Sequence, residues 1–133
     1  MKLLSKFSDF IDKISIRFWD RDEKRALLKL VYEIYNIDCE FSVEEKKNFD
    51  EYIQKFELEI NEVIFMNLGD AISFLKKDEK KLIVAYEWIA EAIYKDGIFN
   101  DKEEKFVQKL QNEYGLSGER IQDHLNQAKQ KLS

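Results

Sequence analysis

The feature of this sequence that most constrains its fold is an eight-residue pattern that occurs twice. The pattern begins with Asp, has Phe at its fourth position, a helix-capping residue at its fifth and Glu at its eighth, and it covers residues 38–45 and 96–103. Ser42 and Asn100 are suitable N-cap residues, and a Glu three positions later completes a capping box. Each copy therefore predicts the start of a helix after a short turn.

The two copies belong to a longer repeat. They lie 58 residues apart, and other identical residues recur at the same spacing: Glu33 and Glu91, Lys47 and Lys105, and Leu58 and Leu116. Self-similarity at a fixed spacing is typical of a duplicated structural unit. We therefore expect residues 20–59 and 78–117 to form two related helix–turn–helix halves.

The remaining sequence also favours helices. It contains no proline and only four glycines, which is little turn punctuation for a fold rich in strands. Apolar residues recur every three or four positions in seven segments, which span residues 3–17, 22–37, 43–56, 60–75, 79–95, 101–114 and 118–131. Gly115 is expected to end one helix and Ser117 to cap the next. We predict an all-α fold of about seven helices in one compact domain over residues 1–133.

The N-terminal segment, residues 1–18, has its own amphipathic pattern. Its apolar positions at helical spacing are Leu3, Phe7, Phe10, Ile11, Ile14 and Phe18. We expect a helix that packs on the domain. The alternative is a helix that lies on a membrane surface, but such helices are normally richer in basic residues. No uncharged stretch is long enough to span a bilayer, so membrane contact would involve residues 1–18 alone.

The charge and cysteine content narrow the possible partners. The net charge of −5 disfavours nucleic-acid binding, which depends on neutralising phosphates, and suits a cation or a basic protein partner. The single cysteine, Cys39, excludes an internal disulfide bond. With no signal peptide in the first residues, the sequence predicts a cytoplasmic protein.

The repeated turns also concentrate carboxylate and amide oxygens. These lie at Asp38, Glu40, Glu44 and Glu45 in the first turn, and at Asp96, Asn100, Asp101, Glu103 and Glu104 in the second. Hard divalent cations prefer oxygen ligands, although the glycine in the second turn is misplaced for the calcium-binding loop of EF-hands. Helix capping explains every shared position without a metal. Both interpretations are open, and the physical chemistry alone favours capping.

The second turn resembles a known family. Residues 89–103 place an apolar helix end before Asp96-Gly97 and a capped helix after it, and that helix closes on Gly115-Leu116. This arrangement is similar to the tellurite-resistance TerB-like family, and by helix order the resemblance covers roughly residues 20–130. The first turn departs from the family pattern because Cys39 stands where the second turn has glycine.

The resemblance implies an all-α bundle of two related halves with a role in tellurite resistance or another stress response. It also implies a divalent cation, Ca²⁺ or Mg²⁺, at the acidic turns. Transferred position by position, the candidate metal ligands are Asp38 and Glu45 in the first turn and Asp96 and Glu103 in the second. The resemblance implies no cofactor other than this cation.

The sequence gives little support for catalysis. The one histidine, His124, and Cys39 fall in different predicted elements, and acidic neighbours disfavour a reactive thiolate at Cys39. There is no glycine-rich phosphate-binding loop. We therefore expect a protein that is not an enzyme and has no catalytic residues.

Two functional hypotheses follow from the sequence. The first is a TerB-like stress-response module that binds a divalent cation. The alternative is an acidic protein-interaction module, such as an immunity protein or antitoxin that neutralises a basic toxin, because acidic side chains can steer association with a basic surface. In both hypotheses the expected partner is another protein.

Overall fold

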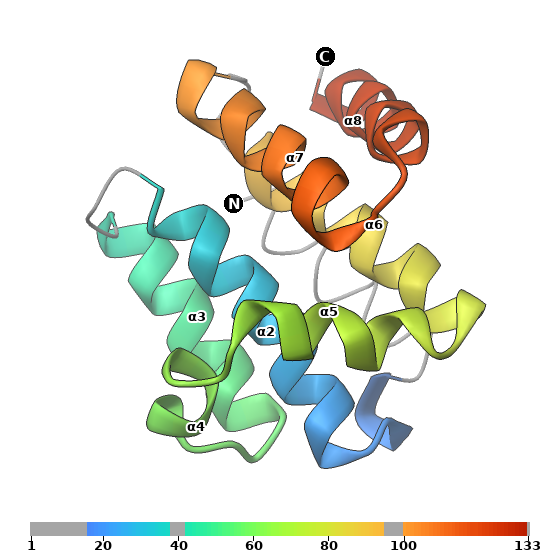
Figure 1. Ribbon diagram of the computed structural model, residues 1–133. Coiled ribbons are helices and arrows are strands. Elements are labelled where there is room, and N and C mark those ends of the chain that lie inside the picture. The colour runs from blue at the N-terminus through green and yellow to red at the C-terminus, as the bar shows by residue number, and fades with distance from the viewer. Residues whose placement is uncertain (1–15, 38–41, 95–99, 133) are drawn as a thin grey trace.

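The computed structural model of the protein describes residues 16–37, 42–94 and 100–132 (Figure 1). Within these ranges the chain forms one short 3₁₀ helix, seven α-helices and no strand. η1 spans Ile16–Phe18, α2 Arg21–Tyr35, α3 Val43–Lys55, α4 Ile60–Ile64, α5 Leu68–Lys76, α6 Glu79–Ile93, α7 Asp101–Tyr114 and α8 Gly118–Leu132. The predicted all-α fold is confirmed.

The helix predicted over residues 60–75 is wrong, because this segment forms two helices. The first, α4, ends at Ile64, and the second, α5, begins at Leu68. Between them Asn67 is an N-cap whose side-chain Oδ1 accepts a hydrogen bond from the Asp70 backbone N–H at 3.1 Å. An asparagine side chain competes with the helical backbone for hydrogen bonds, so it starts a new helix here.

The N-terminal helix predicted over residues 3–17 lies almost wholly outside the described residues, which begin at Ile16. The sequence placed Phe18 on the buried, apolar face, and this prediction is wrong. Phe18 is 74% exposed, whereas Ile16 is fully buried. Both residues belong to η1, whose 3₁₀ geometry has three residues per turn rather than 3.6. The apolar face therefore shifts from the position that α-helical spacing predicts.

Helix α2 is the centre of the bundle. It packs against α3, α4, α5 and α6, whereas α6 packs against α2, α5 and α8. In Figure 1, α7 and α8 lie together at the top of the view, and α3 and α4 lie below them on the left. The largest fully buried side chains are Trp88, Tyr35, Tyr86 and Phe49. Burial of each large apolar side chain contributes roughly 1.5–3 kcal/mol to folding.

The helix pairs α2–α3 and α6–α7 begin at matching positions. Helix α6 begins and ends 58 residues after α2, and α7 begins 58 residues after α3. Two residues at this spacing are also in contact. Lys81 in the first helical turn of α6 forms an ion pair with Glu23 in the first helical turn of α2. The first turns of α2 and α6 therefore lie against each other.

The predicted stop and start between α7 and α8 are confirmed. Gly115 has a φ of 72°, the left-handed conformation that glycine adopts without steric cost. Ser117 then accepts a hydrogen bond from the Arg120 backbone N–H through its Oγ at 3.1 Å. None of the described helices is both long enough and apolar enough to cross a membrane.

Candidate site at the acidic turns

The four predicted metal ligands divide into two groups. Glu45 and Glu103 lie in the first turns of α3 and α7. Asp38 and Asp96 lie outside the described residues, as does Cys39. The structure therefore places the helical side of each predicted cation site, and the loop side stays a prediction.

Both glutamates complete the capping boxes that the sequence predicts. The Ser42 backbone N–H donates to Glu45 Oε1 at 2.8 Å, and the Glu45 N–H donates to Ser42 Oγ at 3.1 Å. The corresponding distances between Asn100 and Glu103 are 3.0 and 2.9 Å. These reciprocal bonds satisfy backbone donors that would otherwise have no partner at a helix start. The capping interpretation is confirmed for both turns.

The two capping carboxylates are unusually buried. Glu45 is 6% exposed and Glu103 is 7% exposed. A buried carboxylate is costly unless hydrogen bonds or opposite charge compensate it, and the positive end of the helix dipole supplies part of that compensation. Because the two oxygens of a carboxylate can accept about four hydrogen bonds, a capping bond does not by itself exclude coordination of a cation.

The structure adds a third buried carboxylate that sequence reasoning missed. Glu91 lies in the last turn of α6, directly before the second acidic turn, and is 3% exposed. Its sequence signal was a single charge within the apolar run from Ile89 to Ile93. A charged residue in such a run must be buried with its apolar neighbours when the whole helix is enclosed.

A buried polar cluster lies beside the first turn, where α2, α3 and α6 meet. Asn48 on α3 and Tyr35 at the end of α2 are both buried, and the Asn48 side chain is close enough to Tyr35 to lower its pKa. Tyr52, one turn after Asn48, packs its ring against Trp88 of α6, with centroids 5.2 Å apart. The cluster therefore joins both helix pairs with polar groups in an otherwise apolar interior.

Burial controls the ionisation of the two tyrosines. It raises the pKa of Tyr35 to about 12, although the nearby Asn48 side chain partly opposes this shift. Burial also raises the pKa of Tyr52, and the nearby Tyr35 and Glu91 raise it further. Both tyrosines are therefore neutral at physiological pH.

No cluster of three or more His, Cys, Asp and Glu side chains that could hold a metal ion occurs in the part of the chain that the structure describes. Two of the four predicted ligands lie outside that part. A divalent cation at the turns therefore stays a prediction, with Glu45 and Glu103 as the placed candidates.

His124 on α8 is partly buried and packs against α6. Its ring stacks on Tyr86 of α6, with centroids 6.0 Å apart and an angle of 13° between the planes. The Tyr86 hydroxyl accepts a hydrogen bond from the Ser117 backbone N–H at 2.9 Å. The His124 ring thus contributes to the packing of α8 against α6.

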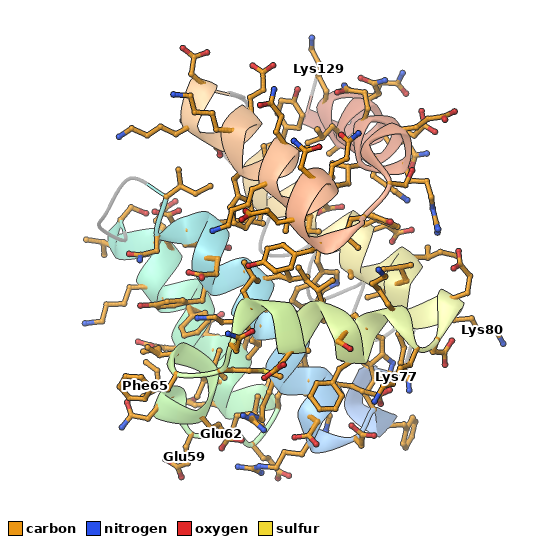
Figure 2. The ribbon with its side chains drawn as sticks, in the orientation of Figure 1. Glu59, Glu62, Phe65, Lys77, Lys80 and Lys129 are labelled. Carbon is orange, nitrogen blue, oxygen red and sulfur yellow. The ribbon has the colours of Figure 1, made fainter. Side chains whose placement is uncertain are left out.

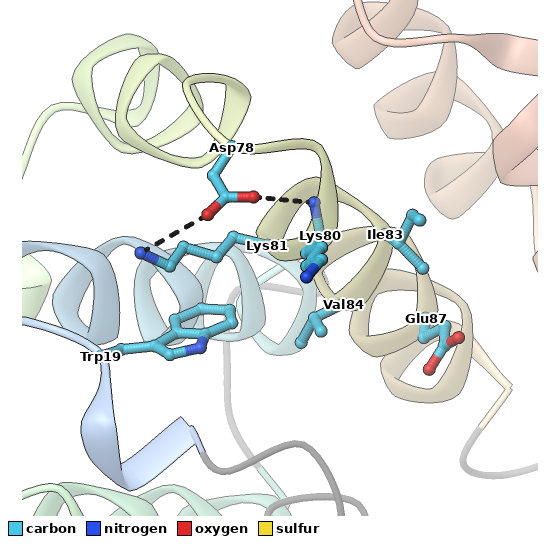
Figure 3. Close-up of a pocket in the computed structure, with 7 residues that line it drawn as sticks. All are labelled: Trp19, Asp78, Lys80, Lys81, Ile83, Val84 and Glu87. Atoms are coloured by element: carbon cyan, nitrogen blue, oxygen red, sulfur yellow. Dashed lines mark hydrogen bonds and ion pairs between the residues drawn. The ribbon is translucent and has the colours of Figure 1, made fainter.

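A pocket of about 400 Å³ opens on the first half of α6 (Figure 3). It was not predicted from the sequence. We call it the Trp19 pocket. Its lining residues are Trp19, Asp78, Lys80, Lys81, Ile83, Val84 and Glu87. Trp19 follows η1, and the other six residues belong to α6 or to its N-cap. The pocket therefore lies between the beginning of the described chain and the middle of the bundle.

An exposed aromatic residue marks another part of the surface. Phe65, at the end of α4, is 81% exposed. Figure 2 shows it beside α4, on the same side of the molecule as Glu59 and Glu62. Glu62 pairs with Arg21 and lies 3.6 Å from Arg25, so the surface near Phe65 carries charges of both signs.

Comparison with known proteins did not identify relatives of this chain. No protein-family model matches it, and neither a curated protein nor a solved structure matches it. The resemblance to the TerB-like family therefore stays a prediction that depends on the residues at the two turns.

Proposed function

We propose that this protein is a non-enzymatic, TerB-like stress-response module that binds a divalent cation, Ca²⁺ or Mg²⁺, at its acidic turns. The observation that carries the proposal is the shared position of Glu45 and Glu103. Each is the third residue of the second helix in its pair, and each is buried. A buried carboxylate is stable when it is paired, hydrogen-bonded or bound to a metal ion, and a cation at each turn would supply such compensation.

The proposal includes two related halves, residues 20–59 and 78–117. The matching starts of the helices in α2–α3 and α6–α7, each 58 residues apart, support it. The ends of α3 and α7 support it as well, because Glu57 and Gly115 both have a positive φ, of 58° and 72°. A similar turn therefore follows the second helix in both halves, at positions 58 residues apart.

The second turn is the stronger candidate for the cation. The helix that follows it, α7, has three acidic residues in its own first helical turn: Asp101, Glu103 and Glu104. The first helical turn of α3 has two, Glu44 and Glu45. A higher ligand charge strengthens calcium binding. We expect Asp96 and Glu103 to form the tighter site, and Asp38 and Glu45 the weaker one.

Calorimetric titration of the metal-free protein with Ca²⁺, Mg²⁺, Mn²⁺ and Zn²⁺ tests the proposal. The informative variant is Asp96→Asn with Glu103→Gln, because glutamine can still complete a capping box. Loss of a ligand charge should weaken binding by about tenfold or more. Glu113→Gln, an exposed change at the far end of α7, is the matched control and should leave the affinity unchanged. Absence of heat with all four metals would refute the cation claim.

The alternative function, an acidic module that neutralises a basic toxin, is favoured by the exposed Phe65. A pull-down from the source cells, with and without chelator, separates the two functions. A partner that is retained in chelator and lost in Phe65→Asp would support the toxin-neutralising module. A partner that is lost in chelator and retained in Phe65→Asp would support the cation-binding module.

A further inference from the structure

A surface stripe runs along α6 beside the Trp19 pocket. It consists of Lys80, Ile83 and Glu87, which lie three and four positions apart and therefore share one face of the helix. Ile83 is 38% exposed, although the other apolar residues of α6 are buried. Figure 2 shows Lys80 extending away from the molecule at one end of the stripe. An exposed apolar side chain beside a concave apolar wall, with charges at the rim, is typical of a contact surface.

The Trp19 pocket itself has apolar walls and balanced charges (Figure 3). Trp19 and Val84 supply the apolar walls beside the stripe. Lys81 Nζ lies 5.8 Å from the centroid of the indole ring and 3.9 Å from Asp78 Oδ2, and it also pairs with Glu23. Because these carboxylates neutralise Lys81, the pocket favours an apolar side chain over an ionic one.

The two ends of the stripe carry opposite charges. Lys80 and Glu87 are separated by two helical turns, or about 10.5 Å along the helix axis. The midpoint between them falls between Ile83 and Val84, the two apolar residues of α6 that line the pocket. In an antiparallel pair of α6 helices with a two-fold axis at this midpoint, Lys80 of each copy faces Glu87 of the other. The stripe is therefore self-complementary in charge, and the symmetry forms the ion pair twice.

We propose that this stripe and the Trp19 pocket form the interface of a homodimer, in which Ile83 of one copy occupies the pocket of the other. The same two-fold axis places Ile83 of each copy opposite Val84 of the second copy, at the apolar wall. A partner with charge of one sign would face either Lys80 or Glu87 with a like charge, whereas a second copy matches both. The stripe and pocket involve fewer than the roughly 20–30 residues per side of a stable interface, so the dimer is expected to dissociate in the micromolar range or above.

Sedimentation velocity of the full chain between about 10 µM and about 1 mM tests the proposal. The weight-average sedimentation coefficient of the wild type should rise with concentration. Lys80→Glu and Glu87→Lys should each weaken the association by about tenfold or more, because each replaces two ion pairs with two like-charge contacts. Lys109→Glu makes the same charge change at an exposed position of α7 and should leave the association unchanged. A wild type that stays monomeric over this range would overturn the proposal.

An equimolar mixture of the two single variants distinguishes this interface from any other. The stripe of Lys80→Glu carries two acidic residues and that of Glu87→Lys carries two basic residues, so the two variants match each other although neither matches itself. The mixture should associate as strongly as the wild type, and the double variant should do so alone. Recovery of association would also show that each single variant is folded. Association of the wild type without recovery in the mixture would place its interface elsewhere and overturn the proposal.

The proposal does not depend on the acidic turns. Addition of EDTA should leave the sedimentation of the wild type unchanged, whether or not the turns bind a cation. The stripe contains none of the proposed metal ligands, so absence of heat in the metal titration would leave the dimer unaffected. Self-association that is lost in EDTA would instead assign the interface to the turns and would overturn the proposal.

Discussion

The helix pairs α2–α3 and α6–α7 begin at matching positions but bury different amounts of their second helix. Helix α3 contributes five buried residues to the interior, among them Phe49, Tyr52 and Ile53, whereas α7 buries only Glu103 and Leu110. The reason is the position of each pair in the bundle. Helix α2 contacts four other helices, and α3 closes one side of that centre, while the face of α6 outside the centre is covered mainly by α8.

The comparison separates two kinds of information in the sequence. The beginnings of α3 and α7 depend on local capping residues, and these are alike in both pairs. Burial depends on which helices pack from outside, and this differs between the pairs. Two segments with similar local sequence can therefore carry different shares of the stability.

The largest expected difference is in the core. Phe49→Ala should lower the free energy of unfolding by about 3–5 kcal/mol, because it removes a fully buried aromatic ring. Val107→Ala, the change at the corresponding position of α7, should cost about 1 kcal/mol, because Val107 is only partly buried and loses two methyl groups. Urea unfolding of both variants measures the two values. Equal costs would show that α7 is as much a part of the core as α3.

The second difference appears at alkaline pH. The pKa of Tyr35 in the folded protein is raised to about 12 from an ordinary value of 10.0. The unfolded chain therefore loses its proton first, so stability is complete below pH 10 and falls as the pH rises toward 12. A shift of this size corresponds to roughly 3 kcal/mol at the upper end. The corresponding residue of the second pair is Ile93, which does not titrate.

Urea unfolding between pH 8 and pH 12 checks this expectation. Tyr35→Phe should reduce the loss of stability above pH 10, whereas Tyr32→Phe, on a partly exposed position of the same helix, is the matched control. An identical pH dependence in wild type and Tyr35→Phe would assign the alkaline loss to other groups.

The capping residues are expected to have similar effects in the two pairs. Ser42→Ala and Asn100→Ala should each lower the free energy of unfolding by about 1 kcal/mol, because each removes the acceptor for a backbone N–H at a helix start. Thermal unfolding of the two single variants measures these costs. A cost confined to one pair would mean that the two turns are not equivalent in solution.

These contrasts explain what the sequence could predict. Ser42, Glu45, Asn100 and Glu103 were identified correctly as capping residues, because a capping box is complete within four positions of the chain. Asn67 was missed, because apolar residues continue at helical spacing on both sides of it and conceal the break.

The candidate site was predictable only in part for a related reason. The burial of Glu91 depends on the helices packed around α6, and the Trp19 pocket forms where a residue before α2 meets α6. Neither property is encoded in a short stretch of sequence, because both require contacts between residues far apart in the chain. The helical halves of the acidic turns were thus predictable, and their surroundings were not.

The smallest expected effects concern the ends of α3 and α7. Both turns need a left-handed residue, and the second pair has glycine there whereas the first has Glu57 with a φ of 58°. A residue with a Cβ is strained in this conformation, so Glu57→Gly should raise the free energy of unfolding by about 0.5 kcal/mol, the relief of strain being partly offset by the greater entropy of unfolded glycine. Gly115→Ala should lower it by about 1 kcal/mol, since the flexible end of Lys76, 3.2 Å from the added Cβ, can move away. Chemical denaturation of both variants measures the two shifts. Opposite signs would show that the turns after α3 and α7 share one geometry and differ only in how well the residue fits it. Destabilisation by Glu57→Gly would instead mean that the Glu57 side chain makes contacts that outweigh its backbone strain.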